Sequence, residues 1–172
     1  MTVLLIFVCF AGKIHMDYPI TSAVRFLREK NVEFVPHLYE YVEKGGTGES
    51  ARQLGVDEHA VVKTLIFETN EKKPLIVLMH GDMQVSAKNL ARHIGVKSVE
   101  PASMDRASKF TGYMFGGTSP FGTRTAMPVY AEKSIFELKS IFINGGKRGF
   151  LVEIDPKNLR EILKIEEIDA GI

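Results

Sequence analysis

The residues best suited to chemistry lie in a glycine-rich stretch between positions 112 and 128. Its centre, positions 116–122, reads Gly-Gly-Thr-Ser-Pro-Phe-Gly. The adjacent Gly116 and Gly117 permit positive φ and a close approach of the backbone to a ligand. Pro120 fixes its own φ and biases the preceding serine towards an extended conformation. We predict a shaped loop whose exposed N–H groups can meet a phosphate or a developing oxyanion. A tight turn between strands is the alternative interpretation.

Lys63 is the most informative single residue. It follows Ala-Val-Val and precedes Thr-Leu-Ile-Phe, so its surroundings are strongly apolar. Lysine is rarely buried without a reason, and a lysine beside a cleft can meet a phosphate or carbonyl oxygen as a point charge. The alternative is a lysine that extends from the end of a strand into water.

A second glycine turn at positions 145–149 carries two cations, Lys147 and Arg148. It could clamp a phosphate by combining exposed N–H groups with both side chains, or it could be a solvated hairpin tip. Neither this turn nor the 116–122 loop fits the P-loop pattern or the dinucleotide fingerprint. Nucleotide-binding motifs of those two kinds are therefore excluded for the glycine-rich segments.

Candidates for an enzyme nucleophile are weak. Thr118 and Ser119 lie in the glycine loop, but no histidine is near them in sequence, and there is no G-x-S-x-G elbow. The single cysteine, Cys9, lies in an N-terminal segment that we expect to be outside the functional domain. These features favour a site built from backbone amides and one lysine over a catalytic triad.

The composition is that of an ordinary globular domain. The chain has 172 residues, 45% of them hydrophobic, and a formal charge of +1, so any basic site must be local. One cysteine rules out a disulfide within this sequence, which fits a reducing cytoplasmic setting. The five histidines show no metal-ligand spacing, so we expect no metal and no other cofactor.

The first residues differ from the rest. Positions 2–11 read TVLLIFVCFA, an apolar run too short to span a membrane. We expect residues 1–15 to be an extension that results from the choice of start codon, followed by a single domain over 16–172. An additional buried strand and a segment for self-association are the alternatives.

Periodicity and breakers predict a mixed α/β domain, with a largely antiparallel sheet or barrel-like core surrounded by helices. The predicted helices cover 21–31, 49–54, 56–62, 86–94, 103–110 and 157–165, with a short helical turn at 134–138. The predicted strands cover 33–41, 63–68, 74–80, 97–99, 127–131, 140–144 and 150–154, the last two forming a hairpin.

The motifs in combination resemble the YbaK/EbsC family of aminoacyl-tRNA deacylases, relatives of the prolyl-tRNA synthetase editing domain. The resemblance covers about 21–165. It depends on His-Leu-Tyr-Glu at 37–40, Val-Lys-Thr-Leu at 62–65, Gly-Tyr at 112–113 with the 116–122 loop, and Gly-Gly-Lys-Arg-Gly at 145–149. Each motif alone is weak, whereas their combination and order are specific.

The resemblance implies hydrolysis of a mischarged aminoacyl-tRNA, typically Cys-tRNA(Pro), at its acceptor end and beside prolyl-tRNA synthetase. It implies no membrane, metal or cofactor. It points to a catalytic surface formed by Lys63, Gly116 and Gly117. The residues implied to bind substrate are Tyr39, Thr64, Thr118, Ser119, Pro120, Gly122, Lys147 and Arg148. In the YbaK branch the substrate's own thiol is the proposed nucleophile, which agrees with the lack of an enzyme nucleophile.

One departure concerns the choice of amino acid. YbaK proper tends to carry Gly-Leu-Asp after the Lys-Arg turn, where this chain has Gly149, Phe150 and Leu151. Members of the wider family remove alanine, serine or threonine, so those substrates stay open. A module that binds tRNA or a synthetase without chemistry and a binder of small phosphates are the competing hypotheses.

Overall fold

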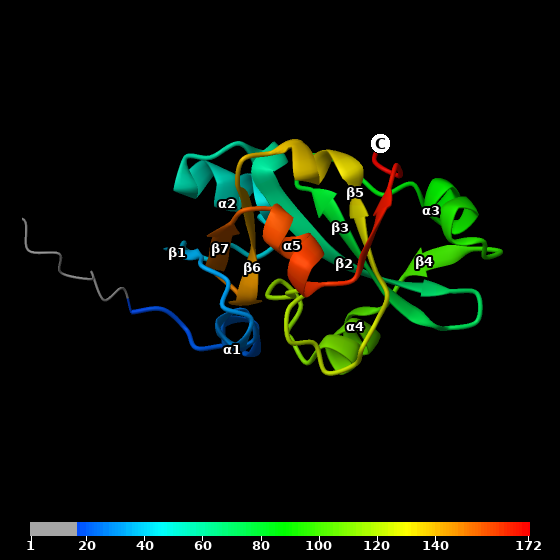
Figure 1. The fold of residues 1–172 in the computed structure, drawn as a ribbon, viewed down its shortest axis with the longest axis horizontal. Coiled ribbons are helices and arrows are strands. Elements are labelled where there is room, and N and C mark those ends of the chain that lie inside the picture. Colours follow the sequence, from blue (N-terminus) through cyan, green and yellow to red (C-terminus); the bar gives the residue numbers. More distant parts are fainter. Residues whose placement is uncertain (1–16) are drawn as a thin grey trace, which may run out of the picture.

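The computed structural model describes residues 17–172 (Figure 1). The expected extension at 1–15 lies outside the described residues. Within them the fold is built on one eight-stranded mixed sheet, in the order β1-β7-β6-β2-β3-β5-β8, with β4 beside β2. The strands are β1 (Val35–Leu38), β2 (Val61–Thr69), β3 (Pro74–His80), β4 (Val99–Pro101), β5 (Val129–Glu132), β6 (Ile141–Lys147), β7 (Phe150–Ile154) and β8 (Ile165–Ile168).

Between residues 17 and 172, five α-helices accompany the sheet: α1 (Ser22–Glu29), α2 (Gly46–Leu54), α3 (Ala87–Ile94), α4 (Met104–Thr111) and α5 (Lys157–Ile162). The pairs β1–β7, β6–β7, β2–β3 and β2–β4 are antiparallel, whereas β2–β6, β3–β5 and β5–β8 are parallel. The mixed α/β prediction is therefore confirmed. No helix in the described part of the chain has both the length and the apolar character needed to cross a membrane.

Two element predictions were wrong. Only a 3-10 turn, Glu58–Ala60, forms within the helix expected at 56–62, and β2 already begins at Val61. The β-branched Val61 and Val62 pair there with β6, so long-range pairing overrides a weak helical pattern. The helix expected to continue to position 165 ends at Ile162, and β8 follows it. β8 is short and carries exposed glutamates, so its strand character comes from pairing with β5.

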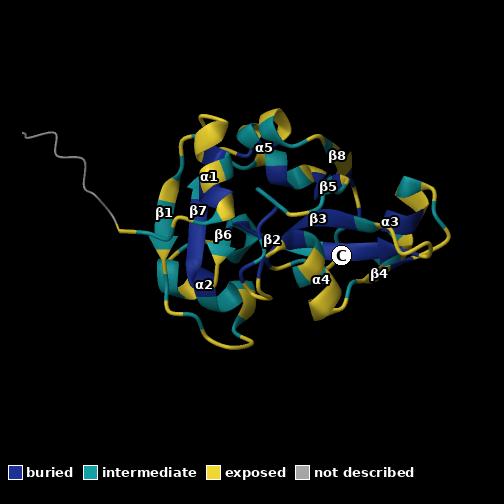
Figure 2. Cartoon of the chain, turned by 90° about the horizontal axis from the view of Figure 1, so that it is seen from below, coloured by how far each residue is buried: buried dark blue, intermediate teal, exposed yellow. Residues whose placement is uncertain are grey.

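The core lies on both faces of the sheet (Figure 2). Helices α1 and α5 cover one face, where Val62 and Ile66 of β2 belong to the largest apolar cluster. Alternate residues of β2 point to the opposite face. There Val61 packs with α2, and Phe67 packs with α3. The stretch of β2 between these two clusters is less buried, and that stretch contains the residues of the site.

Helix α4, which leads into the glycine loop, is attached to β2 by an ion pair. Glu68 is almost fully buried, with a side chain only 4% exposed, and its carboxylate accepts hydrogen bonds from Arg106. The Nε atom of Arg106 lies 2.8 Å from each carboxylate oxygen. A buried carboxylate is costly without its partner, so this pair fixes the start of the loop to the central strand.

We expect Arg106→Ala to lower the free energy of unfolding by about 1–3 kcal/mol, because a buried carboxylate loses its charged donor. The side chain of Arg106 is 47% exposed, so water can partly replace it, and the full cost of an enclosed pair does not apply. Urea denaturation measures the change. Lys133→Ala, which removes an exposed pair with Asp169, is the control and should change stability by less than about 1 kcal/mol. Equal effects of the two variants would contradict the assignment.

Candidate active site

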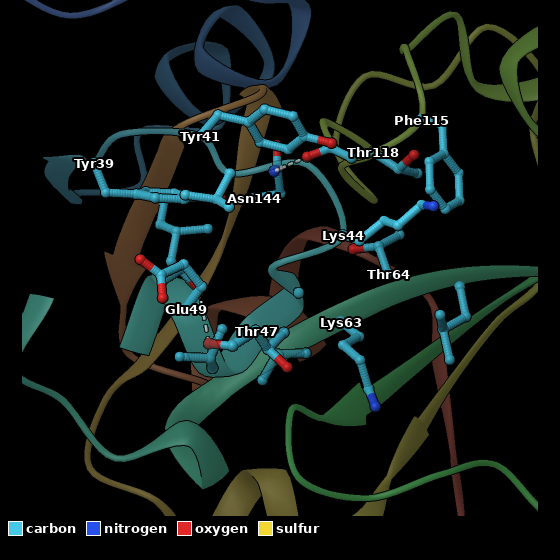
Figure 3. A pocket seen from close by; sticks show the side chains of 18 residues that line it. Tyr39, Tyr41, Lys44, Thr47, Glu49, Lys63, Thr64, Phe115, Thr118 and Asn144 are labelled. Carbon is cyan, nitrogen blue, oxygen red and sulfur yellow. Dashed lines mark hydrogen bonds between the residues drawn. The ribbon is translucent and has the colours of Figure 1, made fainter. Parts of the chain in front are cut away.

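A pocket of about 440 Å³ lies beside the middle of β2 (Figure 3). Its volume falls within the range of about 300–1,000 Å³ that is usual for small-molecule sites. Separate parts of the chain line it: Tyr39, Tyr41, Val42, Lys44, Gly46, Thr47, Glu49 and Ser50, then Val61, Val62, Lys63, Thr64 and Leu65, then Phe115, Gly116 and Thr118, and finally Asn144 and Leu151. The first glycine loop and β2, distant in sequence, thus form walls of one cavity.

The pocket exists because the neighbours of β2 change along its length. At its start β2 pairs with β6 only through Val61 and Val62. At its end it pairs with β4 from Phe67 to Thr69. Between these two contacts, residues 63–65 have no strand beside them on that edge within the described part of the chain. These three residues are only partly buried, whereas β2 is buried on either side of them.

Thr64 lies in the middle of this gap. Its hydroxyl oxygen is buried, yet it is the one buried side-chain polar atom among residues 17–172 that has no hydrogen-bond partner. Buried hydroxyls are normally paired, and an unpaired one calls for an explanation. In Figure 3 the Thr64 side chain points towards the part of the pocket that holds Phe115 and Thr118.

Lys63 lines the pocket, but its amine points away from the glycine loop (Figure 3). The amine donates a hydrogen bond to the backbone carbonyl of Met83. Burial lowers the pKa of Lys63, and the nearby carboxylates of Glu58 and Asp82 partly oppose that effect. The structure therefore brings Lys63 and the glycine loop to the same pocket without placing the amine against the loop.

The glycine loop has an anchored half and a half that faces the pocket. Ser119 is fully buried, and its hydroxyl accepts the backbone N–H of Phe121 at 3.3 Å. The hydroxyl of Tyr113 donates to the Phe121 carbonyl at 2.5 Å, and its burial raises the pKa of Tyr113 to about 12. Pro120 is buried as well. Of the loop residues predicted to bind substrate, only Thr118 lies on the pocket wall, together with Gly116.

Gly122 belongs to the anchored half of the loop. A Cβ atom at this position would lie 2.7 Å from the backbone oxygen of Ser22 in α1. Phe26 of the same helix stacks on Phe121, with ring centroids 6.1 Å apart. Gly122 therefore serves the packing of the loop on α1 and is not part of the pocket wall.

Gly117 packs against the backbone of the β6–β7 turn. A Cβ atom there would lie 2.9 Å from the Arg148 nitrogen and 3.0 Å from the Lys147 carbonyl carbon. The Gly117 N–H donates to the Met114 carbonyl at 2.9 Å, which closes a turn inside the loop. Of the two glycines predicted to be catalytic, Gly117 has its N–H occupied and Gly116 lines the pocket.

Asn144 and Arg148 hold the loop in place. The amide nitrogen of Asn144 donates to the Gly116 carbonyl at 3.2 Å, and its oxygen accepts the N–H of Gly146 at 2.7 Å. The Nε of Arg148 donates to the Phe115 carbonyl at 2.8 Å, and its guanidinium lies over the Tyr41 ring, 4.8 Å from the centroid. Arg148 thus braces the pocket wall, whereas Lys147, also predicted to bind substrate, is exposed and does not line the pocket.

Tyr39 and Glu49 lie on the wall formed by the β1–α2 segment. Burial raises the pKa of Tyr39, so its hydroxyl keeps its proton at neutral pH. Hydrogen bonds from Arg52 and Gln53 lower the pKa of Glu49 to about 2, so that carboxylate stays ionised. The charge of Glu49 is balanced by its ion pair with Arg52 at 2.6 Å, so Lys44 and Lys63 are the charged lining residues that have no ion pair within residues 17–172.

Sequence reasoning missed several pocket residues. The sequence predicts Asn144 only as the end of a strand, and it does not single out Lys44. Lys44 has a φ of 63°, which is rare for a residue other than glycine and costs backbone energy. Neither position has a local signal in the sequence, because pairing of β6 with β2 and closure of the chain over the gap bring both to the pocket. Within residues 17–172, no group of potential metal ligands comes together.

Comparison with known proteins identifies the family. The model of the aminoacyl-tRNA editing domain matches residues 44–162, which include β2, the glycine loop and the β6–β7 turn. The chain belongs to this family. Among the relatives of the editing domain is EbsC of Enterococcus faecalis, a candidate Cys-tRNA(Pro)/Cys-tRNA(Cys) deacylase. It is 29% identical over 138 residues, which make up 80% of this chain and 84% of that protein.

Longer proteins match as well. The proline–tRNA ligase of Streptococcus equi subsp. zooepidemicus is 30% identical over 72% of this chain, and the match spans 20% of that ligase. Among solved structures, a hypothetical protein has a TM-score of 0.81 at 22% identity, with coverage of 88% of this chain and 99% of that one. A candidate trans-editing enzyme for prolyl-tRNA synthetase has a TM-score of 0.77 at 21% identity, with coverage of 90% and 99%. These structures confirm the fold of the editing domain.

We expect Gly117→Val to separate the loop from the β6–β7 turn, because its side chain would overlap backbone atoms of Lys147 and Arg148. The predicted cost is about 1–3 kcal/mol of stability, together with faster hydrogen–deuterium exchange at positions 114–118 and 144–148. Met114→Ala, at a residue that is 68% exposed, is the matched control and should change neither stability nor exchange. Unchanged stability and exchange in Gly117→Val would show that the contact is not needed.

Proposed function

We propose that this editing domain hydrolyses the ester bond of mischarged aminoacyl-tRNA, with Cys-tRNA(Pro) as its substrate. The main support for this proposal is one pocket that is lined by Lys63, Thr64 and the 115–118 loop, all within the region matched by the family model. EbsC, the relative described above, is a candidate deacylase for that tRNA. The sequence similarity to proline–tRNA ligases supports prolyl-tRNA synthetase as the partner that delivers the charged tRNA.

The reaction needs little machinery because an aminoacyl ester is already activated. Attack on the ester carbonyl, by water or by the thiol of a cysteinyl substrate, breaks the bond to the terminal ribose and leaves the tRNA with a free hydroxyl. The protein's contribution is to position the ester and to stabilise the developing oxyanion. The pocket supplies walls for the aminoacyl group. Lys63 on its wall supplies a positive charge, with its amine hydrogen-bonded to the Met83 carbonyl.

Leu151 supports an apolar contact with the amino-acid side chain. It occupies the place where the YbaK pattern has an aspartate, it is 4% exposed, and it lines the pocket. An apolar wall accommodates the thiol of cysteine or the methyl group of alanine more readily than the hydroxyl of serine or threonine, because a buried hydroxyl needs a hydrogen-bond partner. Cysteine and alanine are therefore favoured over serine and threonine.

The decisive experiment uses tRNA(Pro) charged in turn with cysteine, alanine, serine, threonine and proline, with release of the amino acid followed over time. We expect release from Cys-tRNA(Pro) to be fastest and Pro-tRNA(Pro) to be spared. Lys63→Ala should reduce the release rate about a hundredfold or more while the protein stays folded, since loss of one stabilising group of this kind costs that much. Circular dichroism verifies folding.

Lys97→Ala is a suitable control, because Lys97 lies at another surface depression, beside α3. Its release rates should match those of the unaltered protein. Full turnover in Lys63→Ala would contradict the role of the lysine. Binding of the acceptor end without release of any amino acid would favour a binding module and refute the deacylase function.

A further inference from the structure

The backbone of Thr64 faces the open gap of the sheet. Successive residues of a strand present their N–H and C=O groups to alternate edges. Two hydrogen bonds fix this alternation in β2. The Thr69 N–H donates to the carbonyl of Lys73, in the turn that leads into β3, and the Ile66 carbonyl accepts the N–H of Ala102 on the β4 side. Odd-numbered residues therefore bond to β3, and Thr64 presents its N–H and C=O to the opposite edge.

On that edge the backbone of Thr64 meets no strand. The parallel pairing with β6 ends at Val62 and Ile143, and the antiparallel pairing with β4 begins at Phe67. The next residue of β6, Asn144, instead uses its side chain to hold the two glycine turns. Within residues 17–172, Thr64 thus offers a donor, a carbonyl acceptor and an unpartnered hydroxyl to the pocket.

We propose that Thr64 binds the aminoacyl group as a neighbouring strand residue would, with its carbonyl accepting from the α-ammonium group and its N–H donating to the ester carbonyl. An antiparallel partner residue exchanges these two hydrogen bonds with the residue opposite it. One aminoacyl ester carries the same donor and acceptor, spaced as in a residue. This inference rests on the proposed function and specifies its substrate class: esters with a free α-amino group.

Thr64 itself offers two acceptors to an ammonium group in that position. The Thr64 hydroxyl supplies a second acceptor beside the carbonyl. Glu49, on another wall of the pocket, is already paired with Arg52 and is not needed for this contact. An N-acylated aminoacyl group would lose the positive charge and all but one donor, and it would add atoms between β2 and the loop. Peptidyl-tRNA and N-formylated aminoacyl-tRNA are therefore outside the substrate class.

The kinetic test compares Cys-tRNA(Pro) with its N-acetyl derivative and with tRNA(Pro) carrying 3-mercaptopropionate, which lacks the amino group but is smaller. Each enzymatic rate is divided by the uncatalysed rate of the same ester, because the amino group also activates the ester itself. We expect this rate ratio to fall by about 10- to 100-fold for both altered substrates. A fall of that size corresponds to the loss of one hydrogen bond to a charged group. Normal hydrolysis of the mercaptopropionyl ester would overturn the proposal.

A binding test makes the inference independent of turnover. The probe is cysteine joined by an amide bond to 3′-amino-3′-deoxyadenosine, which cannot be hydrolysed as an ester. In ¹⁵N-labelled protein, the Thr64 amide should shift and gain protection from hydrogen exchange with this probe. It should not respond to adenosine alone, and it should respond more weakly to the mercaptopropionyl analogue, which keeps the carbonyl but lacks the ammonium group. A response that is equal for all three ligands would contradict recognition of the ammonium group.

The two proposals can fail separately. If the cysteinyl probe protects Thr64 but no charged tRNA is hydrolysed, the mode of recognition holds and the deacylase function is wrong. If N-acetyl and free aminoacyl esters are hydrolysed equally well, the deacylase function holds and this inference is wrong.

The hydroxyl of Thr64 gives a further prediction. Thr64→Val keeps the shape and the backbone groups but removes the second acceptor, so kcat/KM for Cys-tRNA(Pro) should fall by about 5- to 10-fold. Thr64→Ser keeps the hydroxyl and should remain within about twofold of the unaltered protein. Thermal unfolding of both variants should be close to normal, since the hydroxyl has no partner to lose. Equal activity of the valine and serine variants would show that the hydroxyl makes no contact with substrate.

Discussion

The structure depends on an incomplete pairing of its central strand. β2 is joined on one edge to β3 along almost its whole length, but on the other edge first to β6 and then to β4. Backbone N–H and C=O groups that are not paired with a neighbouring strand must form hydrogen bonds with other groups or with water. The interval between β6 and β4 is therefore the one part of β2 where the sheet can accommodate something other than itself, and the pocket lies there.

The two glycine-rich turns make that interval a cavity of defined shape. The 115–118 loop covers it from one side, and the β6–β7 turn supports the loop through Asn144 and the backbone beside Gly117. Interiors are packed tightly enough that a close backbone contact transmits small shifts. The two motifs, far apart in the sequence, therefore act as a single unit. Of the two cations in the second turn, Arg148 supports the loop through its hydrogen bond to the Phe115 carbonyl.

Much of the fold and some of the site could be predicted from the sequence. The mixed sheet, a shaped glycine loop and the place of Lys63 in a pocket wall follow from apolar runs, turn residues and a lysine in apolar surroundings. The direction of the Lys63 amine could not be predicted, because it is set by the Met83 carbonyl in a loop that has no local signal. Ser119 illustrates the opposite error: a hydroxyl in a promising loop is fully buried and bonds within that loop.

The shortness of the open edge has a consequence for the behaviour of the protein in a crowded cell. Exposed strand edges invite pairing with other chains and so promote aggregation. Here the edge spans only residues 63–65, is bounded by paired strand on both sides, and is covered by the 115–118 loop. A foreign strand would need several consecutive residues to gain a stable ladder, and the gap offers room for about one. The same limit that suits the proposed ester substrate therefore keeps the central strand from pairing with another polypeptide.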